Sequence, residues 1–127
     1  MLKKTIKYTD FNGVEREEDF YFNLTEEELM NMNLSTSGGL KGYIEQIINT
    51  QDTPAIAKLF EKIIRASYGV KSLDGRKFVK SEEILNDFVF TQAYSNLYMS
   101  LVADANVAAD FIKHIIPEKF SAELEKK

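Results

Sequence analysis

The sequence predicts an α+β protein in which an N-terminal β-hairpin packs on a mainly helical domain. Residues 1–22 alternate apolar and polar side chains with a period of two, which is typical of half-buried strands. Residues 25–116 instead repeat apolar side chains at helical spacing. With 127 residues, of which 44% are hydrophobic, the chain can bury one core. We therefore expect a single domain over residues 1–127, with a charged tail at 118–127.

The hairpin register follows from keeping the apolar side chains of both strands on one side. These side chains are Leu2, Ile6 and Tyr8 in the first strand and Val14, Phe20 and Phe22 in the second. A two-residue loop at Asn12-Gly13 would place Ile6 opposite Asp19 and spoil both faces. A three-residue loop over 11–13 pairs Leu2 with Phe22 instead, and its glycine suits the left-handed position that follows a type I turn.

The first two helices are separated by a break rich in serine and glycine. Thr25 and Glu28 form a Thr-x-x-Glu capping box, so we expect a short helix that ends near Leu34. The break covers residues 35–39. A second helix then places an apolar stripe along residues 40–48.

The third helix begins with Pro54 in its first position and carries a strongly apolar face. That face consists of Ile56, Leu59, Phe60, Ile63 and Ile64, with Lys58, Lys62 and Arg65 pointing away from it. Gly69 is the expected C-terminal stop. Residues 70–80 are expected to form a loop with a turn at Asp74-Gly75.

Polar residues mark the starts of the remaining helices. Ser81 is the expected N-cap of one helix and Asp104 of the last strong one, and Thr91 is where the helix between them is expected to restart. Pro117 is expected to end that helix.

The sequence offers no believable catalytic, cofactor or metal constellation, so we expect a protein that is not an enzyme. Cysteine is absent and His114 is the only histidine, which leaves no base for a serine nucleophile and no imidazole pair for a metal. Gly38-Gly39 lacks the pattern of a phosphate-binding loop. Neither a signal peptide nor a membrane span is predicted.

The distribution of charged residues along the chain indicates which kinds of partner it could bind. The net charge of −4 argues against nonspecific nucleic-acid binding. The basic residues at 71–80, with Phe78 among them, are compatible with nucleic acid, but a solvated loop explains them more simply. A basic stretch over 52–80 lies between acidic stretches, a pattern that either neutralises itself within the fold or brings copies of the chain together as a homo-oligomer.

An aromatic-rich segment over residues 88–98 is the best candidate for a partner-binding surface. Aromatic and methionine side chains are enriched in protein interfaces. The candidate residues are Phe90, Tyr94, Tyr98 and Met99, together with Tyr43. Phe90 lies off the main apolar stripe, so core packing explains it least well. Packing on a neighbouring helix remains an equal alternative for Tyr94 and Tyr98.

The chain also resembles small tail assembly chaperones of long, flexible-tailed phages and prophages of Gram-positive bacteria. The similarity covers most of the chain. It is carried by residues 8–13, 20–29, 67–69, 73–78, 91–95, 109–112 and 115–117. Relatives often have an acidic residue directly after the position of Thr91, where this chain has Gln92.

The resemblance implies a role rather than a reaction. Such chaperones are expected to bind tape-measure protein and tail-tube subunits in the cytoplasm of the host bacterium and to be absent from the mature virion. A phage-encoded binder of a host protein, such as a defence inhibitor or trigger, is the alternative. No cofactor, nucleic acid or membrane is expected in either case.

Overall fold

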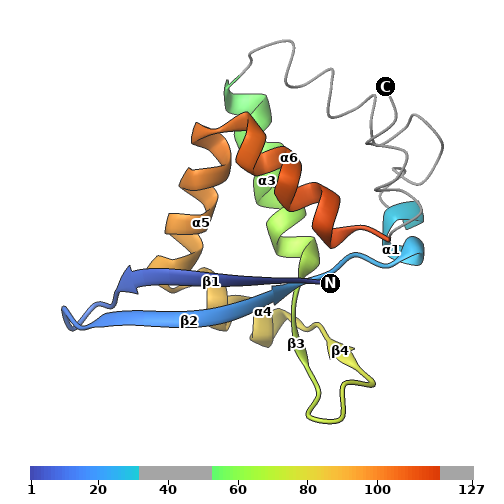
Figure 1. The fold of residues 1–127 in the computed structure, drawn as a ribbon, viewed down its shortest axis with the longest axis horizontal. Helices are drawn as coiled ribbons and strands as arrows, with labels where there is room; N and C mark the ends of the chain where they lie inside the picture. Colours follow the sequence, from blue (N-terminus) through green and yellow to red (C-terminus); the bar gives the residue numbers. More distant parts are fainter. Residues whose placement is uncertain (32–52, 118–127) are drawn as a thin grey trace.

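The fold is that of a computed structural model, in which residues 1–31 and 53–117 are described (Figure 1). Four antiparallel strands form one sheet in the order β1-β2-β3-β4. The strands are β1 (Leu2–Thr9), β2 (Glu15–Phe22), β3 (Tyr68–Lys71) and β4 (Phe78–Val79). The helices are α1 (Glu26–Asn31), α3 (Thr53–Ser67), α4 (Glu82–Val89), α5 (Gln92–Ala103) and α6 (Ala105–Ile115). The predicted α+β class is confirmed.

The β1–β2 hairpin has the predicted register. Leu2 pairs with Phe22, and the Asp10 N–H donates to the Val14 carbonyl at 2.9 Å across the three-residue loop. Gly13 has φ +81°, the left-handed conformation that this loop needs. The rule that both apolar sets share one face was therefore sufficient to fix the strand pairing.

The outward face of the hairpin is polar, as expected. Lys7 lies 3.9 Å from the Glu17 carboxylate, and the Thr5 hydroxyl donates to Asp19 at 2.6 Å. These cross-strand contacts are solvent-exposed and contribute little to stability. The inward face is covered by helices near Ile6, but Val14 at the loop remains exposed.

The first helix begins with the predicted capping box. The Glu28 N–H donates to the Thr25 hydroxyl at 3.2 Å, and the Thr25 N–H donates to the Glu28 carboxylate at 2.8 Å. Both bonds satisfy N–H groups that the helix leaves free at its start. The expected helix end near Leu34, the helix over 40–48 and Tyr43 lie outside the described residues.

Helix α3 ends close to the predicted stop at Gly69, but residues 70–80 are not a simple loop. Helix α3 ends at Ser67, and the chain passes directly into β3, where Gly69 pairs with Tyr21 of β2. Residues 72–77 then form the turn of a second hairpin, with Gly75 at φ +76°. The expected turn at Asp74-Gly75 is thus correct, but it connects two short strands that extend the sheet.

Helices α3, α5 and α6 form a layer over one face of the β1–β2 hairpin, whereas the β3–β4 hairpin extends away from that layer (Figure 1). The core lies beneath these helices, with Phe22 fully buried between the rings of Phe88 and Phe111 at centroid distances of 5.8 and 5.3 Å. The predicted apolar face of α3 contributes Leu59, Phe60, Ile63 and Ile64, all buried, and Ile56, partly buried. The aromatic centre and the face of α3 hold the helices on the hairpin.

Both of the later caps that the sequence predicts are present. The Ser81 hydroxyl accepts the Ile84 N–H at 3.1 Å, and the Asp104 carboxylate accepts the N–H groups of the first turn of α6. Thr91 is also at a helix start, but its hydroxyl donates to the Phe88 carbonyl at 2.6 Å instead of capping α5. It therefore fixes the corner between α4 and α5.

Candidate protein-binding surface

Phe90 lies at this corner as the C-cap of α4, and 73% of its surface is exposed. Its N–H donates to the Asn86 carbonyl at 3.0 Å, which ends the helix in a regular way. The backbone is therefore held in place while the ring remains in solvent. A large apolar side chain placed in this way adds nothing to the core.

Tyr94 and Tyr98 lie on one side of α5 and are each partly buried. Their rings stack with centroids 6.2 Å apart and planes at 23°. The Tyr94 ring also meets the buried Phe88 ring edge-on at 5.6 Å. These contacts hold one side of each tyrosine against the protein, as expected for rings that pack on neighbours, while each ring remains partly exposed.

Met99 is exposed but does not share the side of Tyr94 and Tyr98. Successive helical residues project roughly 100° apart, so the exposed Met99 side chain leaves α5 in a different direction from that of Tyr98. The structure therefore brings the two tyrosines together, places Phe90 at the start of their helix, and leaves Met99 at the border.

A stripe of cations on α3 reaches these aromatic residues at Arg65, and its members were not among the residues predicted for the candidate surface. Lys58, Lys62 and Arg65 are exposed and recur at the four- and three-residue spacing of one helix face. The guanidinium carbon of Arg65 lies 5.6 Å from the Tyr94 ring centroid, within the range of a cation–π contact. Their spacing, opposite the apolar face of α3, was the signal that could have found them.

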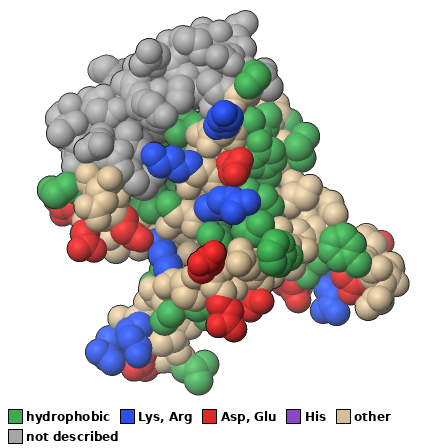
Figure 2. All heavy atoms as spheres, turned by 180° about the vertical axis from the view of Figure 1, so that it is seen from behind, with side chains coloured by type: hydrophobic (Ala, Val, Ile, Leu, Met, Phe, Trp, Pro, Cys, Tyr) green, Lys and Arg blue, Asp and Glu red, His purple; other side chains and the backbone are tan. Residues whose placement is uncertain are grey.

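Together these side chains form a mixed aromatic and basic area, which we call the α3–α5 surface. It consists of Lys58, Lys62, Arg65, Phe90, Tyr94 and Tyr98. Helices α3 and α5 run in opposite directions along it (Figure 1). Figure 2 shows Lys and Arg side chains beside hydrophobic ones over this region of the molecule.

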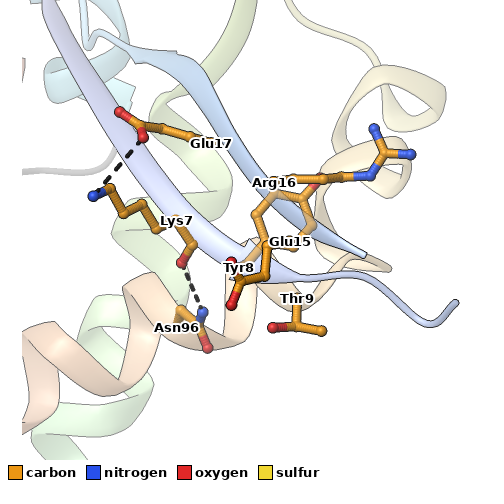
Figure 3. A pocket seen from close by; sticks show the side chains of 7 residues that line it. All are labelled: Lys7, Tyr8, Thr9, Glu15, Arg16, Glu17 and Asn96. Carbon is orange, nitrogen blue, oxygen red and sulfur yellow. Dashed lines mark hydrogen bonds and ion pairs between the residues drawn. The ribbon is translucent and has the colours of Figure 1, made fainter. Parts of the chain in front are cut away.

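A hollow of about 520 Å³ lies beside the far end of the β1–β2 hairpin, but it has the character of an ion-paired surface (Figure 3). It is lined by Lys7, Tyr8, Thr9, Glu15, Arg16, Glu17 and Asn96. Lys7 pairs with Glu17, and Arg16 donates to Asp10 at 2.7 Å. Within the described residues, no group of three His, Asp or Glu side chains could hold a metal ion.

The sequence of residues 1–127 matches the model of a protein family described as phage tail assembly chaperone. The chain belongs to the phage tail assembly chaperone family. Comparisons with curated proteins and with solved structures find no match. Membership of this family implies a tail assembly chaperone role that is non-catalytic and is performed in the host cell during assembly.

Among the described residues of this chaperone, no helix is both long and apolar enough to cross a membrane. His114 lies on the exposed side of α6, where its Nδ1 is 2.7 Å from the Asp110 carbonyl oxygen. That contact is local to one helical turn.

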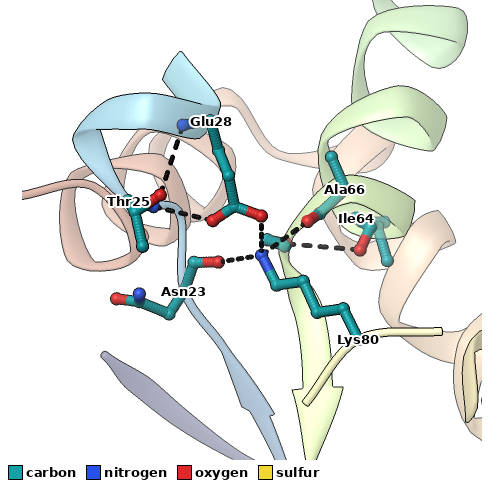
Figure 4. Close-up of polar contacts among 7 residues, drawn as sticks. Asn23, Thr25, Glu28, Ile64, Ala66 and Lys80 are labelled. Carbon is teal, nitrogen blue, oxygen red and sulfur yellow. Dashed lines mark hydrogen bonds and ion pairs between the residues drawn. The ribbon is translucent and has the colours of Figure 1, made fainter. Parts of the chain in front are cut away.

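Lys80 connects three segments of the chaperone through its ammonium group (Figure 4). Its ammonium donates to the Asn23 carbonyl at 2.7 Å, to the Ala66 carbonyl at 2.8 Å and to the Glu28 carboxylate at 2.6 Å. These partners come from the end of β2, the end of α3 and the start of α1. The sequence placed Lys80 in a solvated basic loop, whereas the structure makes it a cross-link between three segments.

Glu28 has two roles at the same point, as capping residue and as partner of Lys80. Partial burial raises the pKa of its carboxyl, but the hydrogen bonds from the Lys80 ammonium and the Thr25 N–H outweigh burial and hold the pKa below its usual value. Glu28 is therefore a carboxylate in the folded chaperone at neutral pH.

Proposed function

We propose that the protein binds tape-measure protein and tail-tube subunits during tail morphogenesis, in the cytoplasm of the host bacterium, and is absent from the mature virion. Family membership supports a role in tail assembly. The observation that carries the specific proposal is the α3–α5 surface, where Phe90 stays exposed beside half-buried tyrosines. From the resemblance in sequence, we infer a flexible-tailed phage or prophage of a Gram-positive bacterium as the source.

The apolar part of this surface suits a helical client. Covering apolar area gains about 25 cal/mol per Å², and the exposed Phe90 ring has the most area left to cover. Tyr94 and Tyr98 are already held by ring contacts, so they lose little conformational freedom when a client binds. A client helix that lays its apolar face along α5 would meet these rings at helical spacing. Met99, at the border, would adapt to side chains of different shape.

The cations of α3 define which apolar helix is preferred. Lys58 and Lys62 are exposed, and Arg65 is exposed with a contact to Glu61 at 3.6 Å. A client helix with acidic residues beside its apolar face would be attracted to this stripe, whereas a basic helix would be repelled. Because the charges are exposed, the preference should weaken as salt concentration rises.

Self-association is a separate hypothesis about the same protein. The exposed cations of α3 and the exposed acids of α4, Glu82, Glu83 and Asp87, are opposite in charge and belong to different elements. Contact between such unlike patches on two copies would be heterologous, which produces rings or filaments rather than closed pairs. Sedimentation at low and high salt tests this, and a strict monomer with and without client would contradict it.

Co-expression with the tape-measure gene or the tail-tube gene of the same phage tests the proposed function. We expect each client to become more soluble and to copurify with the chain in a salt-dependent manner. Expression without the chain is the control. If both clients remain insoluble and a single host protein copurifies instead, the chain is a host-protein binder and the proposal is wrong.

A further inference from the structure

We propose that the outer edge of β1 binds an extended, acidic segment of another protein, which adds to the sheet as a further strand. Within the described residues β1 is one of the two edge strands of the sheet, with β2 as its neighbour. It is also long, with eight residues. This site is separate from the α3–α5 surface and does not depend on the function proposed for that surface.

The direction of the β1 backbone groups follows from its pairing with β2. In an antiparallel pair, the N–H and C=O of one residue point to the same side, and successive residues alternate. The Asp10 N–H donates to Val14 of the partner segment, so even-numbered residues point toward β2. Lys3, Thr5 and Lys7 therefore direct their N–H and C=O groups outward.

One contact shows that the outward-pointing backbone groups of β1 can form a hydrogen bond with a group outside the sheet. The Asn96 side-chain amide of α5 donates to the Lys7 carbonyl at 3.2 Å. An atom outside the sheet thus already occupies one of the positions that an added strand would use. For Lys3 and Thr5 the structure shows no hydrogen bond from a described residue to their backbone groups. An extended segment could pair with these two residues and leave the Asn96 contact in place.

A second hollow, of about 250 Å³, lies along this edge and provides room for the segment. Its walls come from the strand itself and from Asn96, Leu97 and Ser100 of α5 and Val107 of α6. The helices therefore form a shelf beside the strand. Ser100 is small and Val107 is partly buried and apolar, so the side chains that face the shelf should be small or branched apolar ones.

The lysines of β1 indicate which side chains the bound segment should carry on its other face. Lys3 and Lys7 stand on the outer face of β1, and Lys4 lies between them on the other face. Edge lysines commonly prevent strands from pairing with copies of themselves, because like charges would meet. The same lysines attract acidic residues directly across the new pair. The occupant is thus a different protein with acidic and apolar residues in alternation, rather than a second β1.

A synthetic peptide with that alternation, acetyl-Glu-Val-Glu-Val-Glu-Val-amide, is the probe. Added at low salt to the full chain labelled with ¹⁵N, it should shift the amide signals of Lys3, Thr5 and Lys7 and slow their hydrogen exchange. The matching Lys-Val peptide should bind at least about tenfold more weakly, because its charges repel the edge lysines.

The decisive variants differ in one backbone group. Thr5→Pro removes the outward N–H, whereas Thr5→Ala removes the same hydroxyl contact to Asp19 and keeps that N–H. We expect binding of the acidic peptide to fall several-fold in Thr5→Pro relative to Thr5→Ala. Equal binding by the two variants would overturn the proposal.

A charge-reversed variant keeps the test valid if Thr5→Pro does not fold. Lys3→Glu/Lys7→Glu should reverse the preference, so that the Lys-Val peptide binds more tightly than the Glu-Val peptide. No reversal, no binding of the acidic peptide to the native chain at millimolar concentration, or signal changes confined to β4 would each contradict a site on β1.

Discussion

The Phe78 ring occupies the space that a side chain at Gly69 would need. A Cβ atom on Gly69 would lie 2.7 Å from Cε2 of Phe78 and 2.9 Å from the Val79 carbonyl oxygen. Gly69 has no positive φ, so it is required by the close approach of β4 to β3 and not by backbone conformation.

Gly69→Ala should therefore destabilise the fold, by about 1–3 kcal/mol, because ring and backbone must both shift. Denaturant unfolding measures the loss. In a Phe78→Ala background the cost of Gly69→Ala should be smaller but not zero, since the Val79 oxygen remains. A Gly69→Ala variant as stable as the native chain would show that β3 and β4 are not this close.

Lys80→Met should lower the free energy of unfolding by about 1–3 kcal/mol. The variant leaves the Asn23 and Ala66 carbonyls and the Glu28 carboxylate without the ammonium that they share. Lys77→Met is the matched control on the same hairpin. Lys77 is exposed, so its replacement should change stability by no more than about 0.5 kcal/mol. Equal effects of the two substitutions would contradict the cross-linking role of Lys80.

Acid should remove the contribution of Glu28 to stability. Because its pKa is lower in the folded chain than in the unfolded one, the contribution is complete above the ordinary glutamate pKa of about 4.3 and is lost as pH falls through the lowered value. The stability difference between the native chain and Glu28→Gln should therefore shrink with acidification. Asp10 and Asp74, whose pKa values are also lowered, are present in both proteins and cancel in this difference. A difference that is constant with pH would contradict the assignment.

The features that the sequence predicted correctly depend on short-range rules. The hairpin register depends on period-two alternation, in which a shift of one residue would move Ile6 to the polar face. The capping box of Thr25 and Glu28 and the cap at Ser81 involve residues three apart. In such cases the residues that decide the structure are close together in the chain.

The features that were missed depend on distant partners. Strand β3 is only four residues long and exists because Gly69 reaches Tyr21 of β2. Lys80 meets Asn23 and Glu28, which are 57 and 52 residues away in sequence. Likewise, the cations of α3 become part of the candidate surface because Arg65 lies over Tyr94. Spacing along the chain does not contain this information.

The central claim, that the α3–α5 surface binds the tape-measure protein, is tested most directly by Phe90→Ser co-expressed with that client. Phe90 is 73% exposed, so the melting temperature should hardly change, while the soluble fraction of tape-measure protein should fall markedly. Leu73→Ser is the matched control, an even more exposed apolar residue on the β3–β4 hairpin, and should leave the client soluble. If Phe90→Ser melts normally and still solubilises the tape-measure protein as well as the native chain, the claim is wrong.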